Sequence, residues 1–184
     1  MASAPIRILA FAGSLRKNSF NRGLIRAAQD TALSDMAVEV FDLDGIPLFN
    51  QDLEREPPSS VVAFKAAIAS ADGVLIATPE YNFSVPGVLK NALDWASRPP
   101  REQPFVGKPV AIMSAGGRFG GLRAQLQLRQ VGHGMGMLIL SRPEVIVDKA
   151  VEKFDPNGNL TDTGVRDQVQ GLVQALGAWA QRLA

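Results

Sequence analysis

Side chains that could do chemistry are concentrated between Gly13 and Arg22, in the stretch GSLRKNSFNR. Serine hydroxyls, asparagine amides and basic groups follow an apolar run, Ile6–Ala12, and precede an amphipathic segment. At the start of a helix, backbone N–H groups lack intrahelical partners and lie at the positive end of the helix dipole. The stretch therefore predicts an anion site, with one terminal phosphate as the working hypothesis. An ordinary turn capped by Ser19 or Asn21 is the alternative.

The residue types that are missing narrow the chemistry further. The chain has no cysteine, which excludes disulfides, thiolate catalysis and thiolate metal sites. Its one histidine, His133, excludes a multi-histidine metal site, and its place in GHGMGM favours a structural or loop role. No G-x-S-x-G elbow is present. We therefore expect no metal site and no catalytic side chain, with the chemistry supplied by a bound cofactor.

Length and composition indicate an ordinary globular protein. The 184 residues, 46% hydrophobic and 20% charged, suit a single domain spanning 1–184. A formal net charge of +1 disfavours nucleic-acid binding. There is no apolar run of about 18 residues and no signal-peptide pattern, so we expect a cytoplasmic protein without a membrane partner.

Apolar runs alternate with amphipathic segments along the whole chain. Strands are expected at 6–12, 38–41, 73–78 and 109–115, with a last strand between 137 and 147 broken at Pro143. Helices are expected at about 21–34, 60–71, 122–131 and 165–179, and another begins at Val88 and stops before Pro99. This alternation predicts an α/β fold with three layers, in which helices cover both faces of a five-stranded parallel sheet. In the flavodoxin-like order 2-1-3-4-5, the loops after strands one, three and four meet in one crevice.

Those three loops, 13–22, 79–87 and 114–121, restrict the ligand. The first loop has a single glycine, so it lacks the dinucleotide fingerprint G-x-G-x-x-G, and no G-x-x-x-x-G-K-[ST] loop is present. A hydroxyl-rich loop suits a phosphomonoester, and FMN is a mononucleotide that binds at this point of the fold. The polar loop 79–87 could meet the edge of the flavin ring, and the glycines of 114–121 would allow close backbone approach. The alternative for 79–87 is a simple proline turn that leads into a helix, and the alternative for 114–121 is a flexible connection between a strand and a helix.

Long motifs in these loops resemble a known family, the NAD(P)H-dependent FMN reductases of flavodoxin-like fold, close to bacterial quinone, azo and chromate reductases. The similar motifs are GSLRKNSFNR at 13–22, PEYNFSVPGVLKNALDW at 79–95, SAGGRFGGLRAQLQLRQ at 114–130 and KFDPNGNLTD at 153–162. In the first motif, Asn18 stands where glycine is often found.

The resemblance implies noncovalently bound FMN and assigns its contacts by position. The phosphate would be held by Ser14, Arg16, Ser19, Phe20 and Asn21. The ring and ribityl region would meet Pro79, Glu80, Tyr81 and Asn82, and the other side of the ring would meet Ser114, Gly116 and Gly117.

The resemblance also implies an activity and an assembly. A hydride would pass from NADPH or NADH to the flavin, and then to a quinone or similar acceptor (free FMN, an azo dye, chromate), in a ping-pong cycle. The chain would form a homodimer or homotetramer, with Arg123 and Glu144 at subunit contacts and Leu126 in place of a tyrosine. A flavodoxin-like electron carrier is an alternative that the net charge of +1 disfavours. A non-enzymatic FMN-binding module is another.

Overall fold

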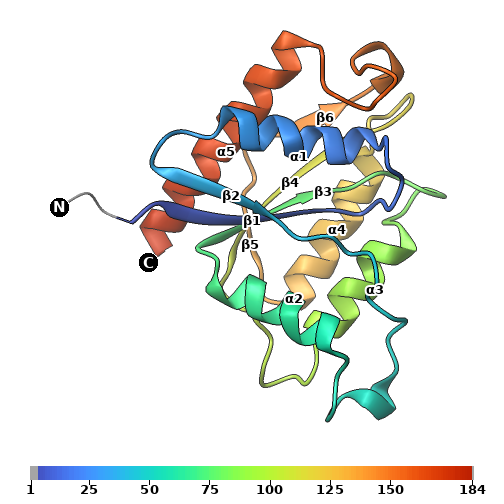
Figure 1. Cartoon of the computed structure of the whole chain (residues 1–184), viewed down its shortest axis with the longest axis vertical. Helices are drawn as coiled ribbons and strands as arrows, with labels where there is room; N and C mark the ends of the chain where they lie inside the picture. The colour runs from blue at the N-terminus through green and yellow to red at the C-terminus, as the bar shows by residue number, and fades with distance from the viewer. Residues whose placement is uncertain (1–3, 184) are drawn as a thin grey trace.

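A parallel sheet with helices on both faces forms the centre of the computed structural model, which describes residues 4–183 (Figure 1). The strand order is β2-β1-β3-β4-β5, and β6 also pairs with β4. The predicted α/β class and strand order are confirmed. The strands are β1 (Ile6–Ala12), β2 (Met36–Val40), β3 (Gly73–Ala77), β4 (Pro109–Ala115), β5 (Leu138–Ile139) and β6 (Val145–Val147).

The sheet has six strands where five were expected, because the last predicted strand forms two separate pieces. β5 pairs with the start of β4, at Pro109 and Val110, whereas β6 pairs with its end, from Met113 onward. Pro143 lies between the two pieces and has no N–H to donate to a neighbouring strand. The predicted break at Pro143 is therefore confirmed.

The helices divide into two layers, as Figure 1 shows. One face of the sheet is covered by α1 (Phe20–Thr31) and α5 (Thr163–Leu183), and the other by α2 (Ser59–Ser70), α3 (Gly87–Ala96) and α4 (Leu122–Gly134). Short 3-10 turns occur at Gln51–Leu53 and Ala150–Glu152. No helix within residues 4–183 is both long enough and apolar enough to cross a membrane.

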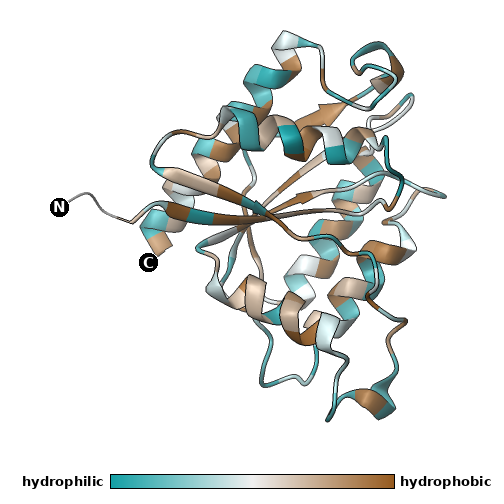
Figure 2. Cartoon of the chain, viewed as in Figure 1, coloured by the Kyte–Doolittle hydropathy of each residue, from teal (hydrophilic) through white to brown (hydrophobic). Residues whose placement is uncertain are grey.

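Alternate side chains of β1, β3 and β4 supply two separate hydrophobic cores. In β1, Ile8 and Ala10 pack toward α1 and α5, whereas Leu9 and Phe11 pack toward α2 and α3. Burial on both faces explains why these three central strands are almost continuously apolar in sequence, and most of their length is brown in Figure 2.

Two element ends differ from the sequence prediction around the first crossover. Helix α1 ends at Thr31 instead of residue 34, and β2 begins at Met36 instead of residue 38. The Met36 side chain is buried against α5, where a Cβ on Gly177 would lie only 2.7 Å from Met36 Cε. Met36 thus belongs to the strand because it packs against α5, and the local pattern of apolar residues does not show a contact so distant in the sequence.

Strands β1, β3 and β4 all end at the same edge of the sheet, so the loops that follow them lie together. Figure 1 shows these loops on the right, opposite the two chain ends. The fold therefore brings the three unusual loops of the sequence to one place, as predicted.

Candidate functional site

A cavity of about 150 Å³ lies between the three loops at this edge. It includes most of the residues predicted to hold FMN, together with one residue that the sequence did not single out, Ala115. The lining residues are Ser14, Arg16, Ser19, Phe20, Asn21, Pro79, Glu80, Tyr81, Ala115 and Gly116. The structure thus places side chains from distant parts of the chain around one space.

The loop before α1 presents several backbone donors that the protein leaves free. The N–H groups of Leu15, Lys17 and Asn18 donate to no acceptor in the described part of the chain. Ser19 caps α1, with its hydroxyl 3.4 Å from the Arg22 N–H, and its own N–H donates to the Arg16 carbonyl. These N–H groups lie in the loop just ahead of the N-cap Ser19, where the positive end of the helix dipole favours an anion.

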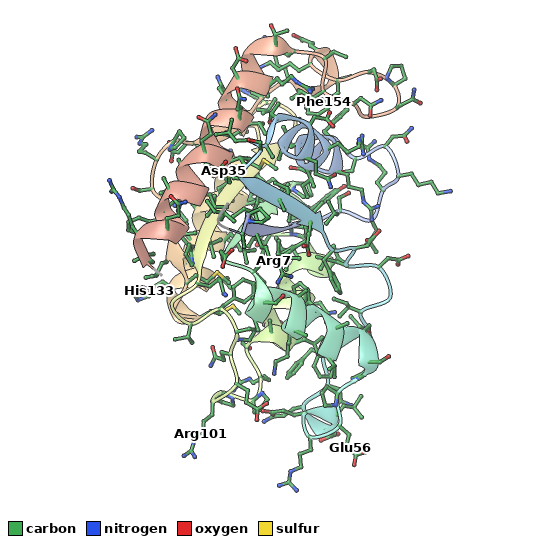
Figure 3. All side chains as sticks on the ribbon, turned by 60° about the vertical axis from the view of Figure 1, so that its left-hand side comes forward. Arg7, Asp35, Glu56, Arg101, His133 and Phe154 are labelled. Carbon is green, nitrogen blue, oxygen red and sulfur yellow. The ribbon has the colours of Figure 1, made fainter. Side chains whose placement is uncertain are left out.

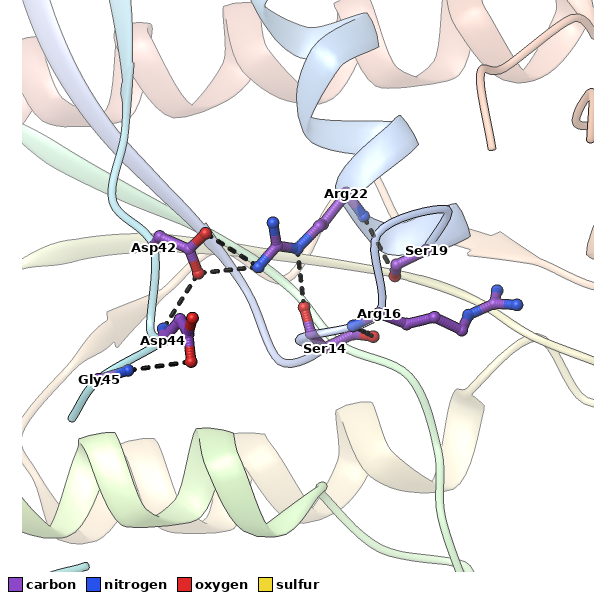
Figure 4. Close-up of polar contacts among 7 residues, drawn as sticks. All are labelled: Ser14, Arg16, Ser19, Arg22, Asp42, Asp44 and Gly45. Carbon is purple, nitrogen blue, oxygen red and sulfur yellow. Dashed lines mark hydrogen bonds and ion pairs between the residues drawn. The ribbon is translucent and has the colours of Figure 1, made fainter. Parts of the chain in front are cut away.

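The two arginines of this loop have different surroundings, which Figure 4 shows. The Arg22 guanidinium donates to both carboxylate oxygens of Asp42, at 2.8 and 3.0 Å, and to the Ser14 carbonyl at 2.9 Å. The Arg16 side chain points away from this pair, and its guanidinium lies 5.1 Å from the centre of the Phe20 ring. Arg22 therefore stabilises the loop, whereas Arg16 is the arginine of this loop that remains available for an anion.

Asn21 connects the first loop to the third. Its side chain is only 2% exposed, and the amide both donates to the Ala115 carbonyl at 2.9 Å and accepts from the Ala115 N–H at 3.0 Å. The Asn21 amide therefore pairs with the last residue of β4 in the way that the backbone of a neighbouring strand would. Asn21 thus sets the spacing of two cavity walls, and its carbonyl and one amide hydrogen are already used.

The loop after β3 forms a tight, strained turn. Tyr81 and Ser84 exchange both backbone hydrogen bonds, and the residues between them, Asn82 and Phe83, have φ angles of 50° and 63°. Asparagine tolerates this left-handed region, but phenylalanine does so at a cost. The turn holds Tyr81 and Phe83 outward, and Phe83 is 65% exposed.

Glu80 joins this loop to the start of α4. Its carboxylate accepts from the Arg123 backbone N–H at 2.9 Å and from the Arg123 guanidinium at 3.0 Å. The Arg123 guanidinium also lies 4.3 Å from the Phe83 ring centre and 4.0 Å from that of Phe119. Because Gly121 provides no side-chain cap for α4, Glu80 fulfils that role from another loop.

The loop after β4 is shaped by glycines other than the two predicted. Gly120 and Gly121 have φ angles of 58° and 87°, and a Cβ on either would lie 2.7 Å from the side chain of Ile146 or Ser114. Gly116 lines the cavity, and a Cβ on Gly117 would meet no atom within 4 Å. The backbone around Gly117 therefore faces open space in which a ligand can approach.

Three of the predicted contact residues do not line the cavity: Asn82, Ser114 and Gly117. Ser114 is 0% exposed, and its hydroxyl accepts from the Gln125 amide at 2.8 Å, so direct ligand contact is not supported there. Gln125 also donates to the Val145 carbonyl and fixes α4 to the sheet. The sequence missed this residue because its partners are distant in the chain.

His133 lies in the last turn of α4, at the end that is distant from the three loops. Figure 3 shows it on the outside of the molecule, well separated from Phe154. This position agrees with the structural or loop role that the sequence favoured.

The groups around the cavity suit a phosphorylated flavin. Free N–H groups, two hydroxyls and the Arg16 guanidinium can satisfy a dianionic phosphate, and open backbone beside Gly117 suits a flat ring. Among residues 4–183, no buried side-chain polar atom lacks a hydrogen-bond partner.

Comparison with known proteins gives one consistent result. Residues 6–152 match the model of the NADPH-dependent FMN reductase family. The chain is 46% identical over 183 residues to an NAD(P)H-dependent FMN reductase of Pseudomonas aeruginosa, covering 98% of each chain. It is 44% identical over 185 residues to an NADPH:quinone oxidoreductase of Arabidopsis thaliana, covering 97% of this chain and 93% of the relative.

A solved structure shows the same relationship in three dimensions. The flavoenzyme NAD(P)H:(acceptor) oxidoreductase FerB of Paracoccus denitrificans aligns with a TM-score of 0.86 and 34% identity, covering 96% of this chain and 97% of FerB. The matches extend over nearly all of the described residues and include the three loops around the cavity. The chain belongs to the NADPH-dependent FMN reductase family.

Proposed function

We propose that this protein is a flavin oxidoreductase that uses NAD(P)H to reduce quinones or similar small acceptors, with FMN bound between the three loops. The observation that carries the proposal is a cavity shared by polar side chains of the first loop, among them Ser14, Arg16 and Ser19, and by residues of the other two loops, in a chain of this family. FMN supplies the redox chemistry: when bound, it accepts a hydride from NAD(P)H and passes two electrons to the acceptor.

In this proposal the first loop binds the FMN phosphate. The Arg16, Ser14 and Ser19 side chains that line the cavity would donate to phosphate oxygens, and the nearby free N–H groups of Lys17 and Asn18 would add further donors. Charge-assisted hydrogen bonds of this kind are the strongest that a loop can offer. Asn21 acts mainly by keeping the loop at the correct distance from Ala115.

The other two loops position the ring in this proposal. Pro79 and Glu80 line one side of the cavity and Gly116 lines another, and their backbone groups would meet the edges of the ring. Backbone N–H groups near the ring carbonyls would stabilise negative charge in the reduced flavin. The side chain of Glu80 holds Arg123 and does not itself need to touch the ring.

No acid or base side chain is required at this site. Hydride transfer depends on the alignment and closeness of the hydride donor and acceptor. In this proposal the three loops provide both by holding the flavin ring in one orientation. We propose a ping-pong order, in which the nicotinamide leaves before the acceptor occupies the same open face of the ring. One open face accounts for the use of several acceptors, including quinones, free FMN, azo dyes and chromate.

Anaerobic reduction of the purified, FMN-loaded protein tests the proposal. We expect NADPH or NADH to bleach the flavin absorbance near about 450 nm, and a quinone to restore it. Steady-state rates with both nicotinamides and a panel of quinone, free FMN, azo dye and chromate would then give parallel double-reciprocal plots. A flavin that binds but is not reduced would favour an electron carrier, and absence of FMN binding would favour a module with another role.

We also propose that the chain assembles as a homodimer or homotetramer through the surface at the start of α4. Four exposed apolar side chains surround Arg123 there: Phe83, Phe119, Leu122 and Leu126. Arg123 and Glu144 are not paired with each other within the chain, since Glu144 pairs with Arg142 at 2.9 Å. Arg123 pairs with Glu80 at 3.0 Å, so in this proposal contacts of Arg123 and Glu144 with a second copy are made in addition to the pairs within the chain.

Light scattering after size exclusion tests the assembly. We expect a dimer or tetramer for the wild type and a smaller species for Leu126→Asp. Leu33→Asp is the matched control, because Leu33 is also exposed but lies beyond the end of α1. A monomeric wild type would contradict the proposal.

We place the enzyme in the cytoplasm because its reductant, NAD(P)H, is available there.

A further inference from the structure

A tight hairpin near the end of the chain, residues 154–160, packs against the first loop of the site. Phe154 and Leu160 pair as antiparallel neighbours, and the Asp155 carboxylate accepts from both the backbone and the side chain of Asn159, at 2.8 and 2.9 Å. Gly158 has a φ of 77° and donates its N–H to the Asp155 carbonyl. These internal bonds give the hairpin a fixed shape without help from a ligand.

The hairpin contacts the first loop through Asn18. The Asn18 side-chain amide donates to the Pro156 carbonyl at 3.0 Å. The two backbones also touch, since a Cβ added to Gly158 would lie 2.8 Å from both the carbonyl carbon and the oxygen of Asn18. A glycine in place of Asn18 would keep this close approach but would lack the hydrogen bond.

The hairpin is anchored to α1 on its other side. Arg26 donates to the Gly158 carbonyl at 2.7 Å and to the Asn159 side chain at 3.1 Å. A Cβ on Gly23 would lie 2.1 Å from the Gly158 oxygen, so the helix and the hairpin are in direct contact. The hairpin therefore moves with the helix whose start forms the anion site.

An aromatic pair extends this contact toward Arg16, which, unlike Arg22 of the same loop, forms no ion pair with a described residue. The rings of Phe154 and Phe20 lie 4.9 Å apart, and the Arg16 guanidinium lies over Phe20 at 5.1 Å. Figure 3 labels Phe154 beside α1. Phe154 is thus connected through the Phe20 ring to the Arg16 guanidinium, the charged group that would bind a phosphate.

We propose that the 154–160 hairpin is a positioning element for the phosphate of FMN, acting through Asn18 and through the Phe154–Phe20–Arg16 stack. The hairpin touches no part of the cavity itself, because none of its residues lines it. Its contribution is to hold the free N–H groups of residues 17 and 18 and the Arg16 guanidinium in place before FMN arrives. Preorganised donors lose less conformational entropy on binding, which increases affinity. The inference rests on the proposed phosphate site.

The test compares FMN with riboflavin, which has the same ring but no phosphate. The protein is stripped of flavin and titrated with each, using quenching of flavin fluorescence. For Asn18→Ala we expect FMN binding to weaken by about threefold to tenfold, the size of one lost hydrogen bond, with riboflavin binding unchanged. Asn18→Gly should lose at least as much. Arg26→Ala, which releases the hairpin from α1, should lower the FMN-to-riboflavin affinity ratio in the same way.

Asn157→Ala is the matched control, because Asn157 lies in the same hairpin and its side chain makes no hydrogen bond within residues 4–183. Thermal unfolding of the flavin-free proteins shows whether each variant folds. A merely structural role would lower the affinity for both flavins equally and leave their ratio unchanged. An unchanged ratio in either Asn18→Ala or Arg26→Ala overturns the inference, and if one of them does not fold the other decides.

Arg16→Ala separates failure of the inference from failure of the proposed function. If the wild type prefers FMN and Arg16→Ala removes that preference, the phosphate site is correct, and an unchanged ratio in Asn18→Ala refutes the hairpin alone. If the wild type binds FMN and riboflavin equally, the phosphate site and the positioning role are both refuted.

Discussion

The Glu80 carboxylate caps α4 by accepting hydrogen bonds from both the backbone N–H and the guanidinium of Arg123. Glu80 follows β3 and Arg123 follows β4, so one carboxylate fixes two of the three loops relative to each other. The side chain is only 14% exposed, which limits screening by water. A residue that the sequence assigned to flavin contact thus has a structural reason to be acidic.

Glu80→Ala should destabilise the protein by removing this cap. We expect the free energy of unfolding to fall by about 1–2 kcal/mol, as for other lost helix caps, and Tm to fall by a few degrees. Glu80→Gln keeps one acceptor and should lose less. Thermal unfolding at one fixed protein concentration measures both.

Glu39→Gln is the control for Glu80, because Glu39 forms an exposed ion pair with Arg7 at 3.6 Å. Exposed pairs contribute about 0–1 kcal/mol, so this variant should unfold close to the wild type. Equal Tm values for Glu80→Ala and Glu39→Gln would contradict the capping role.

At Phe83 we expect the glycine variant to be more stable than the alanine variant, which is the reverse of the usual order. Its φ of 63° is accessible to glycine without strain but costs a residue with a Cβ roughly 1 kcal/mol. Phe83→Ala and Phe83→Gly both remove the ring from Arg123, so their difference reports the backbone alone. We expect Phe83→Gly to be the more stable by about 1 kcal/mol, measured by urea unfolding.

Ser84 supplies a reference for this comparison. It ends the same turn and is not among the residues with positive φ, so Ser84→Ala should be at least as stable as Ser84→Gly. A higher stability of Phe83→Ala than of Phe83→Gly would mean that the turn does not hold its left-handed geometry in solution.

The sequence predicted the elements whose signals are local. The ends of β1 agree with the prediction because Ile6–Ala12 is an apolar run, interrupted only by Arg7, between Pro5 and Gly13. The meeting of the three loops followed from strand order alone, since parallel strands end at one edge. Both results depend on periodicity and topology, which a single sequence carries.

The sequence could not assign the roles of polar side chains whose partners are distant. Asn21 pairs with a residue 94 positions away, and Ser114 meets Gln125 across a helix start. The resemblance to the family assigns both residues to ligand contact by their position in its motifs, and position in a motif does not show which protein groups a side chain also binds. One usable signal was overlooked: Gly120-Gly121 before α4 offers no local cap, which indicates a cap from elsewhere.

Asp155 should make the hairpin sensitive to acid. The backbone N–H of Asn159, followed by its side-chain amide, lowers the pKa of Asp155 below its ordinary value of 3.8. A lowered folded pKa means that the carboxylate stabilises the fold above about pH 4 and that this contribution is lost as pH falls through the folded pKa. Asp155→Asn should therefore unfold more easily than the wild type at pH 7, and the two should converge as the pH falls below the lowered pKa of Asp155 in the folded protein, which thermal unfolding at a series of pH values measures.

Arg16 and Arg22 should separate ligand binding from folding. Arg16→Ala should weaken FMN binding by about tenfold to a hundredfold, the loss of a charge-assisted bond to phosphate, with little change in Tm. Arg22→Ala should lower Tm, because it removes the bonds to Asp42 and to the Ser14 carbonyl. Fluorescence titration with FMN and thermal unfolding of the flavin-free proteins measure the two effects. FMN affinity that is unchanged in Arg16→Ala would mean that the phosphate binds elsewhere, whatever Arg22→Ala does to stability.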